Sequence, residues 1–171
     1  MLGDIVIYKQ NSAQGGRGSQ SITVAASANV INPGEPVVIV AGASTVIPNQ
    51  ATNLFTIVVG TSPFSVSGTG LLGIAQTTST NTATLAGLVD FVPVTSGTVY
   101  LINATASLSI STQAKYDALV GHRVLIDLTA GVYTLLVADA PTASCVIRPL
   151  DVAKFPNKIA FSFRDSVSAL N

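Results

Sequence analysis

The chain has 171 residues, of which 48% are hydrophobic and 9% charged, and eight basic residues balance eight acidic ones. So many hydrophobic residues exclude a disordered chain, and the neutral balance lacks the basic surface of a nucleic-acid-binding protein. One cysteine and one histidine leave no disulfide framework within the chain and too few ligands for a usual metal site.

The beginning of the chain has an early Asp and no long apolar segment, so no signal peptide is expected. The longest strongly apolar run, residues 37–43, is far shorter than the roughly 20 residues that a membrane helix requires. We therefore expect no membrane partner, no nucleic-acid partner, no metal and no cofactor.

The charged residues are distributed unevenly, with three in residues 1–17, two in residues 18–114 and eleven in residues 115–171. Typical soluble domains are about 25% charged, so much of this surface must consist of hydroxyl, amide and backbone groups. Burying such a surface in an assembly costs little, whereas each buried ion loses on the order of several kcal/mol of solvation. The composition therefore favours a protein that packs into an assembly.

Residues 1–20 are predicted to form an N-terminal arm. Residues 4–8 (DIVIY) contain three β-branched apolar residues and a Tyr after the Asp, and they can pair as a strand. They lead into KQNSAQGGRGSQS, where three glycines remove backbone constraint and nothing apolar anchors a core. We interpret this segment as a flexible linker or an arm that orders on binding, with a frayed terminus as the alternative.

The middle of the chain predicts a series of short strands, because β-branched residues alternate with polar ones between Gly, Pro, Ser and Asn breaks. Pro33 and Gly34 suit the two central positions of a type II turn, so residues 22–40 are predicted to form a hairpin. Further strands are expected at residues 54–61, 64–67, 71–76, 84–94 and 98–103.

The strand expected at residues 84–94 has a clear alternation. Leu85, Val89 and Phe91 are expected to point to one face, and Asp90 to the other. The preceding segment, TTSTNTA at residues 77–83, is a polar and uncharged loop whose hydroxyls and amides can form hydrogen bonds.

The last part of the chain begins with the one predicted helix. Thr112 suits the N-cap of a helix over residues 113–120, and Gly121 suits its C-terminal end. RVLIDL, VYTLLVA, SCVIRPL and KIAFSFR then predict strands, the first two joined across TAG as a hairpin. We expect a mainly β fold: an antiparallel β-sandwich or β-barrel with one short helix, at about residues 113–120, and a flexible arm. One domain would span residues 21–171, with a candidate sub-boundary near 104–114.

Motifs of catalysis are weak in this chain. Gly68, Gly70 and Gly73 match the spacing of the dinucleotide fingerprint, but that site needs a following helix, and IAQTTSTNTAT is a poor helix. We interpret these residues as turn glycines between strands.

The remaining candidates for catalysis are the single histidine and the single cysteine. A hydrolase would have to use His122 with Asp127 or Asp117, and no nucleophile motif is present. Cys145 lies in a predicted strand and is better explained as a small buried hydrophobe. The sequence therefore predicts no catalytic residue and a protein that is not an enzyme.

Four basic residues lie near the end of the chain among acidic neighbours. We interpret this group as a solvated strand surface or one that faces another subunit. Its ion pairs would then set the register between subunits more than their affinity. Aromatic residues are too few and too distant to make it a base-stacking platform. The four residues are Arg148, Lys154, Lys158 and Arg164.

Several segments together resemble the capsid decoration and stabilisation (cement) proteins of tailed bacteriophages. They are PGEPVVI at residues 33–39, LLGIAQTTSTNTATLAGLVDFVPVTSGTVYLI at 71–102, and the ending YDALVGHRVLIDLTAGVYTLL with CVIRPLDVAKFPNKIAFSFRD. In that family pattern a "GEPVV" strand precedes a "GIA" strand, a Thr/Ser/Asn/Ala loop and an "AGxVxxxPV" strand. The resemblance covers residues 30–165.

The resemblance implies a β-rich module without catalytic residues that binds the outer surface of the assembled capsid, often as a trimer, and bridges neighbouring major capsid proteins. A ligand that binds only the assembled shell stabilises it by mass action, and many copies add up through multivalency. We therefore expect the major capsid protein and other copies of this chain, as a homotrimer, to be its partners. The expected location is the virion surface, after synthesis in the host cytoplasm.

Two regions are predicted to make the contacts. The arm would reach a neighbouring subunit through Tyr8, Lys9 and Arg17, and the polar loop would contribute a second set: Thr77, Thr78, Thr80 and Asn81. The alternatives are another virion component, such as a head-fibre base, a neck protein or a tail-tube protein, and a carbohydrate-binding β-sandwich. A carbohydrate-binding domain usually presents exposed aromatic residues, and this chain has no Trp.

Overall fold

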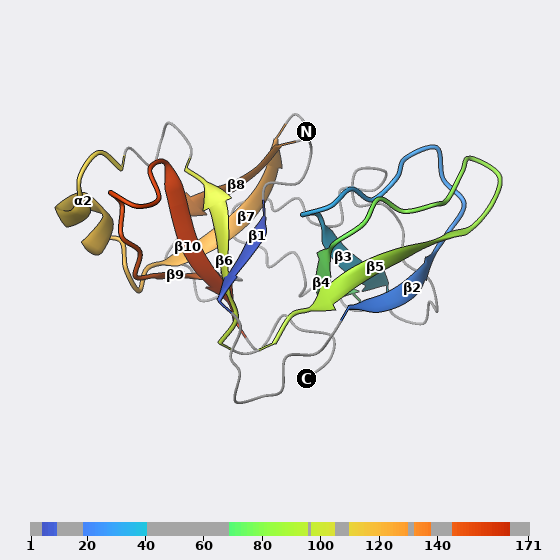
Figure 1. The fold of residues 1–171 in the computed structure, drawn as a ribbon, viewed down its shortest axis with the longest axis horizontal. Helices are drawn as coiled ribbons and strands as arrows, with labels where there is room; N and C mark the ends of the chain where they lie inside the picture. The colour runs from blue at the N-terminus through green and yellow to red at the C-terminus, as the bar shows by residue number, and fades with distance from the viewer. Residues whose placement is uncertain are drawn as a thin grey trace.

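The computed structural model describes residues 5–9, 19–40, 69–95, 97–104, 110–129, 132–137 and 145–164. They form two antiparallel β-sheets and one short helix, which confirms the expected mainly β fold, without a closed barrel in this part of the chain. Figure 1 shows the two sheets side by side, with the helix at the end remote from the smaller sheet. None of the described helical residues belongs to a helix long and apolar enough to cross a membrane.

The larger sheet has six strands in the order β1-β6-β10-β9-β7-β8. Their bounds are β1 (Val6–Lys9), β6 (Val99–Asn103), β10 (Lys158–Phe163), β9 (Cys145–Arg148), β7 (Arg123–Thr129) and β8 (Val132–Val137). The smaller sheet has four strands in the order β2-β5-β4-β3. These are β2 (Gln20–Val24), β5 (Gly87–Pro93), β4 (Thr69–Ala75) and β3 (Pro36–Val40).

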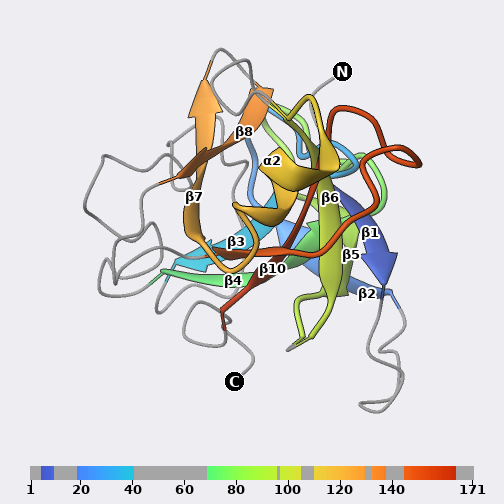
Figure 2. The same ribbon diagram turned by 90° about the vertical axis from the view of Figure 1, so that its left-hand side faces the viewer.

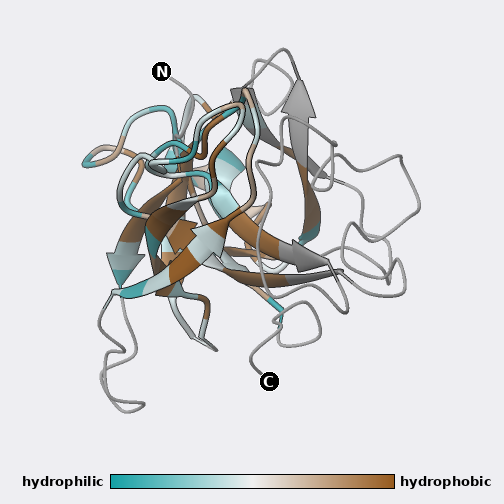
Figure 3. Ribbon diagram, turned by 90° about the vertical axis from the view of Figure 1, so that its right-hand side faces the viewer, coloured by the Kyte–Doolittle hydropathy of each residue, from teal (hydrophilic) through white to brown (hydrophobic). Residues whose placement is uncertain are grey.

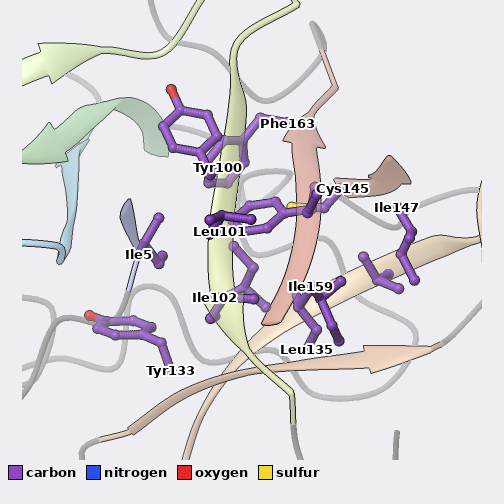
Figure 4. Close-up of a cluster of buried hydrophobic side chains, with 14 of the residues drawn as sticks. Ile5, Tyr100, Leu101, Ile102, Tyr133, Leu135, Cys145, Ile147, Ile159 and Phe163 are labelled. Atoms are coloured by element: carbon purple, nitrogen blue, oxygen red, sulfur yellow. The ribbon is translucent and has the colours of Figure 1, made fainter. Parts of the chain in front are cut away.

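The main hydrophobic core draws on both sheets. The six-stranded sheet contributes aromatic rings packed edge to face, with the Tyr100 and Phe163 centroids 5.3 Å apart and the Phe161 and Phe163 centroids also 5.3 Å apart. Cys145 is buried among these rings, as expected for a small hydrophobe (Figure 4). Leu71 of β4 belongs to the same cluster, so the two sheets pack on one another through a common core.

The four-stranded sheet buries side chains on both of its faces. Val37 and Val38 are neighbours in β3, yet they pair with Gly73 and Leu71 of β4, so Leu72 is the additional residue of a β-bulge. Leu71 therefore joins the main core, while Leu72 joins a smaller cluster on the opposite face. That smaller cluster consists of Val24, Ile31, Val37, Leu72, Ala75, Val89 and Phe91, with Ile22 packed against it.

The hairpin predicted over residues 22–40 is wrong, because β2 and β3 lie at opposite edges of their sheet. The turn itself forms as predicted: the Glu35 amide donates to the Asn32 carbonyl at 3.1 Å, and Gly34 has φ 81°. Residues 25–31 do not continue as a strand, and the Ile31 amide and carbonyl bond instead to Ser79. The partner of β3 is therefore β4, whose hydrogen bonds satisfy the β3 backbone.

Other predicted elements formed with shifted ends. The strand expected at residues 84–94 begins at Gly87, so Leu85 lies in the preceding loop and does not share the buried face of Val89 and Phe91. Strands β7 and β8 pair as the predicted hairpin, and the strands expected at residues 54–61 and 64–67 lie outside the described residues.

The helix α2 (Gln113–Asp117) is shorter than the predicted 113–120. Thr112 is its N-cap as predicted, but its C-cap is Ala118, and Gly121 ends the turn that follows. The Thr112 hydroxyl accepts from the Lys115 amide at 3.3 Å, and Gly121 has φ 89°. Tyr116 fixes the helix to the six-stranded sheet, since its hydroxyl donates to the Arg148 carbonyl at 2.7 Å and accepts from the Ala160 amide at 2.9 Å. Figure 2 shows α2 from the left-hand side of Figure 1, where the helix faces the viewer.

Candidate contact surface

The loop between β4 and β5, residues 76–86, is held by a buried polar network. Ser79 and Asn81 are each only 5% exposed. The Ser79 hydroxyl accepts from the Ile31 amide at 2.8 Å and donates to the Asn81 side chain. The Asn81 amide group donates to the carbonyls of Ser27 at 3.1 Å and Asn29 at 2.9 Å. This loop is therefore tied to the segment that follows β2, and its shape is fixed from within.

The same loop runs alongside β5 and completes its hydrogen bonds. The Thr80 amide donates to the Leu88 carbonyl at 3.0 Å, and the Leu88 amide donates back to the Thr80 hydroxyl at 2.9 Å. The Thr77 hydroxyl likewise accepts from the Asp90 amide at 3.1 Å. Gly87 permits this close approach, because a Cβ there would lie 2.1 Å from the Asn81 nitrogen.

Two leucines project outward from this rigid loop and strand. Leu85 is 66% exposed and Leu88 is 54% exposed. The loop residues 76–86 carry no charge, and the charge nearest to Leu88 along β5 is that of the partly buried Asp90. Figure 3, which faces this end of the molecule, shows mostly pale or teal loops beside strands that contain brown segments. We call Thr78, Thr80, Leu85 and Leu88 the loop surface.

The two charged residues of the low-charge segment are both engaged within the protein. Glu35 is 1% exposed, and its carboxylate accepts from the Asn32 amide at 2.9 Å. Asp90 accepts a hydrogen bond from the Ser21 hydroxyl. The four residues of the loop surface are therefore uncharged, and the nearby Asp90 is already partly buried and hydrogen-bonded, so a partner that covers them has little ionic surface to desolvate.

The predicted contact residues of the loop have different environments. Thr78 and Thr80 are exposed, and Thr77 is exposed with its hydroxyl bonded to β5. Asn81 differs from the expectation, because its side chain is buried and holds the loop to residues 27–29. Sequence reasoning missed the exposed leucines, although Leu88 is in phase with Asp90, which was expected to point away from the core.

The predicted contact residues of the arm lie on the six-stranded sheet. Tyr8 and Lys9 belong to β1, an edge strand of the six-stranded sheet. The Tyr8 ring meets Phe155 edge-on, with centroids 5.1 Å apart, and the Lys9 ammonium lies 5.1 Å from the Tyr8 ring centroid. Arg17 lies outside the described residues. The first residues of β1 share a hollow with Gln76 at the start of the loop, but Tyr8, Lys9 and residues 77–81 are not part of that lining.

A hollow of about 460 Å³ lies beside Tyr8, but hydrogen bonds engage its polar side chains. Gln113 donates to the Asp117 carboxylate at 2.7 Å and accepts from the Val152 amide at 3.0 Å. Asp151 accepts from the amides of residues 153 and 154. We therefore regard the hollow as a weaker candidate than the loop surface. Its lining consists of Tyr8, Lys9, Gln113, Asp117, Pro149, Leu150 and Asp151.

The four basic residues near the end of the chain do not converge on one site. Arg148 donates to the Ser162 hydroxyl at 2.7 Å, and Lys158 donates to the Asn103 side chain at 2.6 Å. Lys154 lies over the Phe155 ring, 5.6 Å from its centroid. Each of these three basic side chains thus contacts a different partner on the six-stranded side of the molecule.

The residues that were considered for catalysis have structural roles in the fold. Gly73 lies within β4, where a Cβ would lie 2.2 Å from the Val92 carbonyl oxygen, so close strand packing accounts for the glycine. His122 links the end of the helix region to β9, because its carbonyl accepts from the Ile147 amide at 3.1 Å. The described residues hold no group of three His, Cys, Asp or Glu side chains arranged for a metal ion.

Two buried tyrosines have perturbed ionisation. Burial raises the pKa of Tyr116, the hydrogen bond from the Ala160 amide partly opposes this, and the nearby Asp117 charge adds to it. Burial also raises the pKa of Tyr100. Both hydroxyls therefore stay neutral, and Tyr116 acts as a structural donor and acceptor.

Comparisons of the chain with protein-family models, with curated proteins and with solved structures found no match. Its function is therefore inferred from the sequence pattern and the geometry of the loop surface.

Proposed function

We propose that the chain is a non-enzymatic structural protein of a virion, which binds the outer surface of an assembled phage capsid and stabilises it by bridging major capsid protein subunits. It works as a homotrimer on the virion surface. The resemblance to capsid decoration proteins runs through the same residues that form β4, the loop surface and β5.

The observation that carries this proposal is the rigid, uncharged loop surface with its two exposed leucines. Leu85 and Leu88 are two of the few large apolar side chains exposed among the described residues, they lie three positions apart in the chain, and exposed apolar surface of this kind can contact another protein. The hydrogen bonds of Ser79 and Asn81 fix the loop before binding, so little conformational entropy is lost when a partner covers it. Identical copies would then combine modest affinities across the repeating lattice of a shell.

The proposal is tested by sedimenting the protein with empty shells assembled from the major capsid protein of the same phage. The wild-type chain is expected to sediment with the shells and to raise the temperature at which they dissociate, because it binds the assembled state only. Unassembled major capsid protein serves as the control and should bind much more weakly. A wild-type chain that leaves shells unoccupied contradicts the proposal, and labelled copies found in rings or tubes would favour a neck or tail-tube component.

The loop surface is tested by the double substitution Leu85→Ser with Leu88→Ser. Both side chains are mostly exposed, so the free energy of unfolding should change by less than about 1 kcal/mol, while affinity for shells should fall roughly tenfold or more. Ala153→Ser is the control, since Ala153 is exposed on the six-stranded side and lies outside both predicted contact regions. Equal losses of affinity in the control and the double variant would show that the loop surface is not the contact.

A further inference from the structure

Strand β2 is an edge strand of the four-stranded sheet, and among the described residues it pairs with β5 alone. Edge strands present unpaired backbone donors and acceptors, and proteins usually protect them with a charge, a proline or a bulge. The sequence of β2, QSITV, contains neither a charge nor a proline, and its pairing with β5 shows no register shift. By contrast, β1 carries Lys9 and a register shift, and β3 carries Pro36 and a register shift.

The hydrogen bonds of β5 reveal which backbone groups of β2 face outward. The amides and carbonyls of Leu88 and Asp90 are bonded to residues 76–80, on the side of β5 away from β2. Backbone groups alternate in direction along a strand, so those of Val89 point to β2, where Val89 pairs with Ile22. The N–H and C=O groups of Ser21 and Thr23 must therefore point to the open edge.

These outward groups are self-complementary. Ser21 and Thr23 lie two residues apart with Ile22 between them, so a second β2 that approaches antiparallel about a two-fold axis at Ile22 pairs Ser21 with Thr23 of the other copy. Each of the two Ser21–Thr23 pairs exchanges two backbone hydrogen bonds, and Ile22 meets Ile22 as a non-hydrogen-bonded pair. All outward donors and acceptors of Ser21 and Thr23 are then satisfied.

The side chains favour the same partner. Ile22 is only partly buried against the smaller hydrophobic cluster, and the pairing would set Ile22 against Ile22, extending an apolar row from Val89 of one copy to Val89 of the other. On the opposite face, Asp90 would lie in a row with Leu88 of the second copy, so the two carboxylates do not oppose each other. We propose that β2 is a two-fold docking edge for β2 of a second copy of this chain.

This proposal rests on the β2 edge and not on the proposed function, and it applies whether each partner is a single chain or part of a trimer. On a shell, such pairing would link neighbouring copies to one another in addition to their contacts with the capsid protein.

Cysteine cross-linking tests the register directly. Non-hydrogen-bonded pairs have Cα atoms about 4.5 Å apart, within the range of a disulfide, so Ile22→Cys should form a disulfide-linked dimer under mild oxidation. Cys145 is buried and is the only native cysteine, so it should not compete. Thr23→Cys is the matched control, because two Thr23 residues would be diagonal neighbours at roughly 7–8 Å and should not link to each other.

A mixture of two single-cysteine variants provides the positive control for the cross-linking experiment. Ser21→Cys and Thr23→Cys proteins should each remain unlinked alone and should link when mixed. Pairing of β2 with some other edge of a second copy, such as β8, would leave Ile22→Cys unlinked and would overturn the proposal. Equal linking of Ile22→Cys and Thr23→Cys would indicate random collision and would also overturn it.

A second variant tests the association without cysteines. Thr23→Pro removes an N–H that points to the open edge, so the bonds between β2 and β5 remain and the variant should fold. Its dissociation constant for the pair should rise roughly tenfold or more, because two symmetric hydrogen bonds are lost. Light scattering at a concentration where the wild type is paired should then give half the wild-type mass. An unchanged mass would contradict the proposal.

Discussion

The two sheets of this protein are stabilised in different ways. In the six-stranded sheet, aromatic and aliphatic side chains such as Tyr100, Phe161 and Phe163 form a continuous core, and the described basic residues lie on this side. In the four-stranded sheet, the hydrophobic cluster is small, and the loop beside β5 depends on buried polar groups of Ser79 and Asn81. We infer from this difference that the larger sheet provides most of the stability, whereas the smaller sheet presents a fixed, uncharged surface.

The largest loss of stability is expected from Gly73→Ala, which should disrupt the smaller sheet and leave the larger one intact. The added Cβ would lie 2.2 Å from the Val92 carbonyl oxygen and 2.5 Å from Cδ2 of Phe91, so β4 and β5 would have to separate. We expect a loss of about 3 kcal/mol or more in the free energy of unfolding, measured by urea denaturation.

Gly121→Ala is the control for this substitution. Its Cβ meets nothing within 4 Å, and only the positive φ of 89° opposes it, so the loss should be about 1–2 kcal/mol. If Gly73→Ala lowers the free energy of unfolding no more than Gly121→Ala does, then β4 and β5 can move apart at little cost, contrary to this prediction.

Local signals in the sequence predicted most of the described elements but not their pairing. The turn at Pro33 and Gly34 and the cap at Thr112 depend on neighbouring residues, and both formed as predicted. The hairpin over residues 22–40 failed, because the pairing of β3 with β4 joins segments about 35 residues apart, and no short-range pattern encodes it. The bulge at Leu72 arises from that pairing and could not be foreseen either.

The next effect concerns the polar network. Asn81→Ala should leave the carbonyls of Ser27 and Asn29 without their donors and should cost about 2 kcal/mol of unfolding free energy. Affinity for shells should fall as well, since the loop loses its fixed shape. Denaturation and sedimentation with shells measure the two effects.

A double-mutant cycle checks that the network acts as a unit. Ser79 and Asn81 share a hydrogen bond, so the costs of Ser79→Ala and Asn81→Ala should be less than additive when combined. Thr78→Ala, an exposed substitution in the same loop, should change stability by less than about 0.5 kcal/mol. Additive costs would mean that the two side chains stabilise the loop independently.

The candidate site was predicted only in part, for a reason that these residues illustrate. A run of Thr, Ser and Asn predicts a loop rich in hydrogen-bonding groups, and the structure has this loop between β4 and β5. Whether each group faces solvent or the protein depends on residues 27–31, which are distant in sequence, so Thr78 is exposed whereas Asn81 is buried. The exposed Leu85 was misplaced because the alternation was carried past the beginning of β5, whereas Leu88 lies within β5 on the face opposite Val89 and Phe91.

The smallest effects come from two tyrosines of the six-stranded sheet and its helix. Tyr116→Phe leaves the Ala160 amide and the Arg148 carbonyl without the hydroxyl that joins them, so we expect a loss of about 1–2 kcal/mol. The Tyr100 hydroxyl is buried and has no hydrogen bond of good geometry with any described residue, although the Thr98 side chain is close enough to lower its pKa against the larger effect of burial. Tyr100→Phe should therefore change stability by less than about 0.5 kcal/mol, or increase it, because it removes a desolvated hydroxyl from an aromatic core. Thermal and urea denaturation of the pair would show whether the larger sheet depends on packing, as proposed, and a large loss for Tyr100→Phe would reveal a polar dependence like that of the smaller sheet.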